Sequence, residues 1–275
     1  MNQYSNQHST MKQTLVYPWI ANMSRGNELK FSLRSVEKNF SGPVEVWIVG
    51  DKPNWYCGNC LPIPPYDSKL ILPRQDRAKK LWRVVEEPSI DNEFLWMMDD
   101  IYFLRTVDLD LFRIPWFRGA LSPDQIEQKR PKTEWERQKL LTWQTLKDNG
   151  RPLFDFGTHL PQIYQKDNLR ILFEKYGLRD APYVDDILYG NEFLSERLVE
   201  ELLKTDSQDS LNRIKTTGNV NRIQYRETGR PTLSGLQKRA ARKQSRVFNH
   251  VDKSYTPTVE QFLMEKFPNP SRWEK

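Results

Sequence analysis

Two adjacent aspartates, Asp99 and Asp100, are the residues whose types and spacing point most directly to chemistry. They lie in EFLWMMDDIYFL, residues 93–104, between two apolar runs that are typical of a buried strand. Neighbouring carboxylates at the end of such a strand repel each other unless a cation offsets the repulsion, and Mg²⁺ and Mn²⁺ prefer oxygen ligands shared with substrate phosphates. We therefore expect Asp99 and Asp100 to hold Mn²⁺ or Mg²⁺. The alternative is that the pair caps a following turn or helix.

Two further residues are candidates for proton transfer. His159 lies in FDFGTHLPQ, after a Gly-Thr turn, where a ligand-facing role and a structural hydrogen bond are the two alternatives. Asp186 belongs to a second acidic pair in APYVDDILYGNEF. A general base, a second metal ligand and a solvated turn are the alternatives for that pair. We expect His159 and Asp186 to be catalytic.

Four arginines are expected to contact an anionic ligand. Arg25 lies in the loop after the first predicted strand, and Arg74 and Arg77 follow a strand predicted at 70–72. Arg34 lies on a predicted helix whose exposed face also carries Glu37 and Lys38, so a surface ion pair is its alternative role.

The excess positive charge of the chain is concentrated near its C-terminus. Residues 213–246 contain ten basic residues and one acidic residue, so this segment carries +9 whereas the whole chain carries +6. Such a segment is typical of contacts with nucleic acid, an anionic membrane or a diphosphate, and a solvated surface is the alternative. The residues expected to contact a polyanionic acceptor are Lys238, Arg239, Arg242 and Lys243.

Composition and motifs exclude several classes of protein. The 275 residues include 13 Phe, 11 Tyr and 9 Trp, which is too many aromatic residues for a wholly disordered chain. Neither a GxxxxGK[ST] nor a GxGxxG phosphate loop occurs, which disfavours P-loop and dinucleotide enzymes. Cys57 and Cys60 lack the further ligands of a structural zinc site, so we expect two reduced thiols in a proline-rich loop and no disulfide partner.

The periodicity of apolar residues predicts an α/β fold. Short apolar runs at 14–20, 44–49 and 93–104 alternate with helical patterns at 27–39 and 76–87, as in an open and mostly parallel sheet with helices on both faces. Ligands bind at the carboxyl ends of such strands, where Asp99 and Asp100 lie. The pattern after Arg118 is mainly helical, with an amphipathic helix at 133–149, and predicts a helical C-terminal half.

The chain divides into three predicted parts. Residues 1–13 form a polar leader expected to be disordered, 14–205 a catalytic domain, and 206–275 a basic segment that is partly flexible and packs on that domain. No apolar run reaches the roughly 18 residues that span a bilayer, and the first residues lack the apolar stretch of a secretory signal. We expect a cytoplasmic location.

Four blocks of the sequence resemble the Stealth family of sugar-phosphate transferases. The blocks are NELKFSLRS at 27–35, VWIVGDKPNWY at 46–56, LWMMDDIYFL at 95–104 and THLPQIYQKDNLRILFEKY at 158–176. The paired aspartates also resemble the DxD element of GT-A-type glycosyltransferases. The chain departs from the Stealth pattern at Met98, where that family has Asn.

The resemblance implies a GT-A-like fold and a nucleotide-sugar donor whose diphosphate is held by the metal at Asp99 and Asp100, with Asp99 also contacting the donor. Arg34 and His159 would then contact the donor phosphate or assist transfer. We expect a metal-dependent glycosyltransferase that transfers a sugar to an acceptor hydroxyl on a glycan or on modified nucleic acid, as some bacteriophage enzymes do in DNA modification. The alternatives are a Stealth-like hexose-1-phosphate transferase acting on a glycan and a non-enzymatic nucleic-acid-binding protein.

Overall fold

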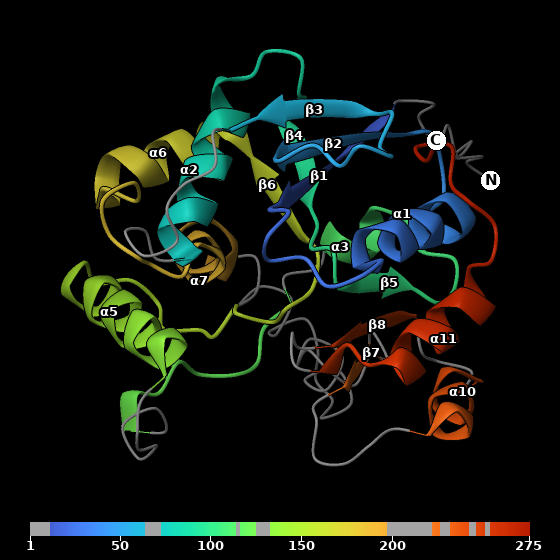
Figure 1. Cartoon of the computed structure of the whole chain (residues 1–275). Coiled ribbons are helices and arrows are strands. Elements are labelled where there is room, and N and C mark those ends of the chain that lie inside the picture. Colours follow the sequence, from blue (N-terminus) through green and yellow to red (C-terminus); the bar gives the residue numbers. More distant parts are fainter. Residues whose placement is uncertain are drawn as a thin grey trace, which may run out of the picture.

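The molecule is built on an open five-stranded sheet of order β3-β2-β1-β4-β6 (Figure 1). The structure, a computed structural model, describes residues 12–63, 73–113, 116–124, 133–196, 222–225, 232–241, 246–250 and 254–275. Strands β3, β2, β1 and β4 run parallel, and β6 pairs antiparallel with β4. The predicted α/β class with a mostly parallel sheet is confirmed. The strands are β1 (Gln13–Trp19), β2 (Val44–Gly50), β3 (Asn59–Pro62), β4 (Glu93–Trp96) and β6 (Gln162–Gln165).

Helices cover both faces of this sheet, as predicted. Side chains alternate along a strand, so Leu15 and Tyr17 of β1 pack against the α1 side, whereas Val16 packs against the α2 side. In Figure 1, α1 lies on one side of the sheet and α2, α6 and α7 lie on the other. The amphipathic helix predicted at 133–149 is α5, and Thr133 begins it with a capping box closed by Glu136. These helices are α1 (Glu28–Asn39), α2 (Pro73–Glu86), α5 (Glu134–Asp148), α6 (Lys166–Tyr176) and α7 (Asp185–Tyr189).

The apolar stretch around the paired aspartates forms two strands in different sheets, whereas the sequence predicts one buried strand that ends at the pair and no second sheet. The chain leaves the large sheet after Trp96 and enters a three-stranded sheet of order β5-β8-β7 at Ile101. Both strands are buried on both faces, so hydrophobicity alone does not mark the break. The C-terminal half, which the sequence predicts to be helical, also contains strands. The remaining elements are β5 (Ile101–Phe103), α3 (Asp110–Arg113), a π-helix η1 (Gly190–Leu194), β7 (Arg222–Tyr225), α10 (Leu233–Ala241), β8 (Val247–His250) and α11 (Pro257–Lys266).

The segment around the two cysteines also differs from the prediction. Residues 59–62, expected to be loop, form the edge strand β3, where a proline at the end of the strand is tolerated because its missing N–H faces no partner strand. Cys60 lies in this strand, and the Cys57 thiol donates to the Arg272 carbonyl at 3.3 Å. Both cysteines are free thiols. The strand expected at 70–72 lies outside the described residues.

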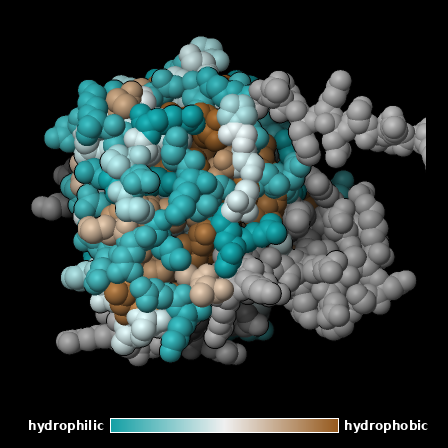
Figure 2. All heavy atoms as spheres, turned by 90° about the vertical axis from the view of Figure 1, so that its right-hand side faces the viewer, coloured by the Kyte–Doolittle hydropathy of each residue, from teal (hydrophilic) through white to brown (hydrophobic). Residues whose placement is uncertain are grey.

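The C-terminal end of the chain packs against the first helix. The Arg34 guanidinium donates to both carboxylate oxygens of Glu274 at 2.7 and 2.6 Å, and also to the Phe267 carbonyl. Burial opposes ionisation of Glu274, but these hydrogen bonds outweigh it and lower its pKa. Figure 2, which views the side where α1, α11 and the C-terminus lie in Figure 1, shows a mainly hydrophilic surface with small hydrophobic patches between the polar groups.

The ends of the predicted parts fall partly outside the described residues. Strand β1 begins at Gln13, one residue inside the predicted leader, and residues 1–11 lie outside the description. The boundary predicted at 205 also lies outside it. None of the helices that the structure describes is both long and apolar enough to cross a membrane.

Candidate functional site

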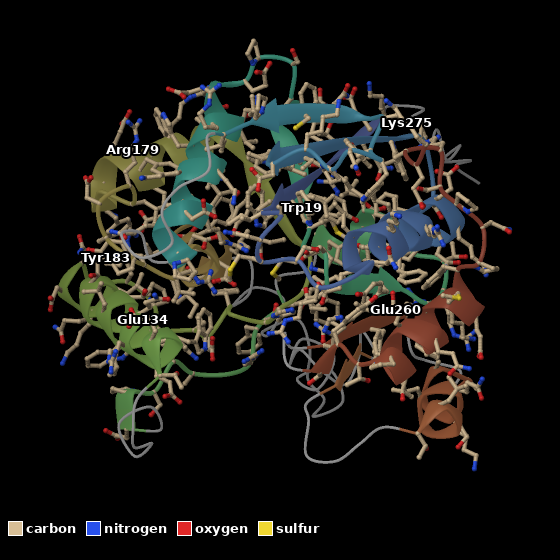
Figure 3. The ribbon with its side chains drawn as sticks, viewed as in Figure 1. Trp19, Glu134, Arg179, Tyr183, Glu260 and Lys275 are labelled. Atoms are coloured by element: carbon tan, nitrogen blue, oxygen red, sulfur yellow. The ribbon has the colours of Figure 1, made fainter. Side chains whose placement is uncertain are left out.

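A cleft of about 260 Å³ lies at the carboxyl ends of β1 and β4. Strand β1 pairs with β2 on one side and with β4 on the other, so the strand order reverses between β1 and β4, and open α/β sheets bind ligands at such a point. Trp19 ends β1 and lies near the middle of the molecule, between the helices of the two sides (Figure 3). The lining residues used below are Arg25, Arg77, Lys80, Asp99, Asp100 and His159.

Asp99 and Asp100 both line this cleft, so the predicted acidic pair faces one cavity and not two separate regions. Asp100 is buried, and its Oδ2 lies 2.8 Å from the His159 Nε2. Its Oδ1 is also buried and has no hydrogen-bond partner among the described residues. Burial opposes ionisation of Asp100, yet the neighbouring His159 outweighs it and lowers the pKa of this carboxyl. Asp100 thus lines the cleft as a carboxyl group whose pKa is lowered and whose buried Oδ1 has no hydrogen-bond partner in the described part of the chain.

His159 is held in an unusual backbone conformation. Its φ is 55°, and it is the one non-glycine residue with positive φ in the described part of the chain. Such strained positions are enriched at functional sites. The loop before it is anchored by Asp155, whose carboxylate accepts from the Gly157 N–H at 3.0 Å and from the Lys139 ammonium at 2.6 Å. His159 lines the cleft, and these contacts hold the loop that precedes it.

Three cationic side chains line the same cleft, together with the carboxylates of Glu28 and Asp76. Arg25 follows β1, as predicted, and Arg77 comes from α2. Lys80 was not identified from the sequence. It is buried, and its Nζ lies 2.5 Å from the Asp76 carboxylate. Burial lowers the pKa of Lys80, and Asp76 opposes that shift. Its three-residue spacing from Arg77, which puts both on one face of the helix, is the signal that could have identified it.

Arg74 and Asp186 belong to a cluster around Asp185 that also includes Arg77, and neither of them is among the residues that line the cleft. Asp185 is buried and accepts from Arg74 at 3.0 Å, from the Arg77 Nε at 2.8 Å and from the Tyr164 hydroxyl at 2.7 Å. The nearest oxygen of Asp186 is 4.0 Å from Arg74. Burial, together with the charge of Asp185, raises the pKa of Asp186. The prediction that Arg74 and Asp186 join the paired aspartates is therefore not supported by this arrangement.

The other predicted contacts do not meet at the cleft either. Arg34 does not line it and is instead bound to Glu274, because helix α1 turns this side chain toward the C-terminus. Lys238 is exposed on α10. The side chain of Arg239, as well as Arg242 and Lys243, lies outside the described residues.

The paired aspartates fit a divalent ion whose other ligands are phosphate oxygens of a substrate and water. Within the described ranges no group of three or more His, Cys, Asp or Glu side chains is arranged to hold a metal, so a cage made of protein ligands alone is not present there. Mg²⁺ in phosphate-transfer sites is commonly held by one or two carboxylates together with substrate phosphates and water. The unpartnered Oδ1 of Asp100 is the atom that such an ion would satisfy.

No family model matches this chain, and no curated protein matches it. Among solved structures it is similar to the apo form of mouse xyloside xylosyltransferase 1, with a TM-score of 0.38 and 10% sequence identity over 87% of this chain and 97% of that one. A likeness at this TM-score carries no argument about function, so the function is argued from the geometry of the cleft.

Proposed function

We propose that the chain is a glycosyltransferase that uses a nucleotide-sugar donor and Mn²⁺ or Mg²⁺. The observation that carries the proposal is the unpartnered, buried Oδ1 of Asp100, next to Asp99, in a cleft at the switch point of the sheet. A carboxylate oxygen buried without a donor is costly, which favours a cationic ligand at this position. Arg25, Arg77 and Lys80 line the same cleft together with Glu28 and Asp76, and Lys80 is paired with Asp76 and Arg77 with Asp185. Arg25 is therefore the cation that the proposal assigns first to an anionic partner of that ligand, such as a diphosphate.

The division of roles follows from these positions. A divalent ion, when bound, would neutralise the charge that develops on the leaving diphosphate. Asp99 and Asp100 would hold that ion, and Arg25, Arg77 and Lys80 would supply further positive charge to the donor. A neutral His159 imidazole that donates its Nε2–H to Asp100 carries its lone pair on Nδ1, so Nδ1 is the atom proposed to accept the proton of the acceptor hydroxyl. Asp186 is not proposed as the base because it does not line the cleft.

A thermal-shift screen tests the proposal. UDP-, GDP-, CMP- and dTDP-sugars are each added with and without Mn²⁺. We expect one nucleotide class to raise the Tm by roughly 5 °C or more at about a hundredfold excess over its Kd, and only when the cation is present, because ligand and ion share the site. A screen without any shift, or with shifts that ignore the cation, contradicts the proposal. Analysis of the products then separates transfer of a sugar from transfer of a sugar phosphate.

We further propose that the acceptor hydroxyl belongs to a nucleic acid, which the charge of residues 213–246 and the exposure of Lys238 favour over a neutral glycan. Binding to duplex DNA should weaken as salt rises, because each phosphate contact releases counterions. Filter binding measures this dependence. The variant Lys238→Glu should reduce the affinity, whereas Lys147→Glu, an exposed lysine on α5, serves as the control and should reduce it less. Affinity that does not change between low and moderate salt would exclude a nucleic-acid acceptor.

A further inference from the structure

We infer that Asn249, in strand β8, is a positioning residue that fixes the conformation of His159 and thereby the His159–Asp100 pair. Asn249 is fully buried, and its side-chain Nδ2 donates to the His159 carbonyl at 2.7 Å. The two residues are 90 positions apart in the sequence, so β8 brings a donor to the loop from the far end of the chain. The kinetic test of this inference depends on the proposed function, whereas the hydrogen-exchange test of the His159 conformation does not.

The backbone of His159 requires such support. Residues other than glycine rarely adopt a backbone φ of 55°. A donor that binds the carbonyl of His159 favours this left-handed conformation over the ordinary ones with negative φ. Asp155 anchors the loop before His159 through the Gly157 N–H. Asn249 anchors the loop at His159 itself, so the two contacts together fix the segment that directs the imidazole toward Asp100.

The same strand also fixes the position of Asp100. Strands β5 and β8 pair antiparallel, and Asn249 lies opposite Ile101, the residue directly after Asp100. One residue of β8 therefore aligns the carboxylate through the backbone pairing and the imidazole through a side-chain hydrogen bond. The C-terminal segment thus takes part in building the cleft.

The asymmetry of the Asn249 amide indicates that its donor group is what the site uses. Its Oδ1 is buried and has no hydrogen-bond partner in the described part of the chain. Asn191, by contrast, is a buried asparagine with every group engaged. Its Nδ2 donates to the Phe154 carbonyl at 2.8 Å and its Oδ1 accepts from the Phe154 N–H at 2.8 Å. Asn191 binds the same loop at Phe154 and not at His159, so Asn191→Ala is a matched control for Asn249→Ala.

The experiment compares Asn249→Ala with Asn191→Ala by two readouts. The first is the exchange of the imidazole N–H of His159 with water in protein carrying isotope-labelled histidine, with the signal assigned through His159→Gln; this readout needs no substrate. The second is a kinetic double-mutant cycle with His159→Ala. We expect Asn249→Ala to speed the exchange about tenfold and to lower kcat by about 10- to 100-fold with little change in KM, because small misplacements of a catalytic group have effects of this size. In the His159→Ala background, Asn249→Ala should have no further effect on kcat.

Three results would overturn the inference. The first is an unchanged His159 exchange rate in Asn249→Ala, the second is an equal increase in that rate in Asn191→Ala, and the third is an additive effect of Asn249→Ala on kcat in the double-mutant cycle. If Asn249→Ala does not fold, Asn249→Ser, which retains a shorter hydroxyl donor, should still exchange the His159 imidazole N–H faster than the wild type, and an unchanged rate would overturn the inference. If the His159 imidazole N–H exchanges faster in Asn249→Ala but the wild type transfers no sugar, Asn249 positions His159 and the proposed function is wrong.

Discussion

Asp100→Asn is expected to lower kcat by about a thousandfold and to remove the cation-dependent part of donor binding. The substitution keeps the size of the side chain but removes the charge that is proposed to hold the divalent ion and that faces His159 at 2.8 Å. Loss of one preorganised group that stabilises developing charge has an effect of about this size. Steady-state kinetics give kcat, and the thermal shift with and without Mn²⁺ gives the cation dependence of donor binding.

Asp91→Asn is the control for this prediction. Asp91 follows α2 and lies at the opposite, amino end of the parallel strands, where its carboxylate accepts from the Thr14 hydroxyl at 2.6 Å. A neutral amide can accept the same bond, so kcat should remain within about twofold of the wild type. Full activity in Asp100→Asn, or equal losses in both variants, would show that the metal assignment is wrong.

Asp185→Asn is expected to lower the free energy of unfolding by about 3–5 kcal/mol, because it removes one partner of a buried charge cluster and leaves the arginines uncompensated. Asp185 binds Arg74, Arg77 and Tyr164 while almost fully buried. Urea denaturation measures the loss. The matched control is Asp167→Asn, whose ion pair with Arg170 at 2.6 Å is exposed, and a loss below about 1 kcal/mol is expected there. Similar losses in the two variants would contradict a structural role for the Asp185 cluster.

The pH dependence of stability provides a second measurement on Asp185. Burial raises the pKa of this carboxyl, but Arg77 and Arg74 outweigh burial, so its pKa in the folded protein is lowered. The stabilisation is therefore fully present above the unfolded-state pKa of about 4 and is lost as the pH falls through the lower folded-state pKa. The wild type should lose stability over this acid range more steeply than Asp185→Asn. Parallel profiles of the two proteins would contradict the predicted shift.

Much of the architecture could be predicted because it depends on local patterns. The alternation of Leu15, Val16 and Tyr17 indicates a strand covered on both faces, and Thr133 with Glu136 marks the start of α5. The break between β4 and β5 could not be predicted in this way. Both strands are buried, and hydrophobicity reports burial without reporting which sheet a strand joins.

The candidate site was predicted in part for the same reason. Asp99 and Asp100 are neighbours in the chain and follow a strand of a parallel sheet, so their place at the carboxyl edge follows from the pattern alone. Arg74 and Arg77, in contrast, are three residues apart on one helix and only Arg77 lines the cleft, while both bind Asp185, which comes from α7 more than a hundred residues later. The spacing of the two arginines along the helix does not indicate that Asp185 is their partner.

The sequence by itself determined the acidic pair, the alternation of the first strands and helices and the excess of positive charge near the C-terminus, because each depends on residues close together in the chain. Tertiary structure alone decided that His159 meets Asp100, that Asn249 holds the His159 backbone and that Arg34 turns to Glu274. These contacts join residues 59 to 240 positions apart. Their distances depend on how the two sheets and the C-terminal strand β8 pack, and packing is a property of the whole chain.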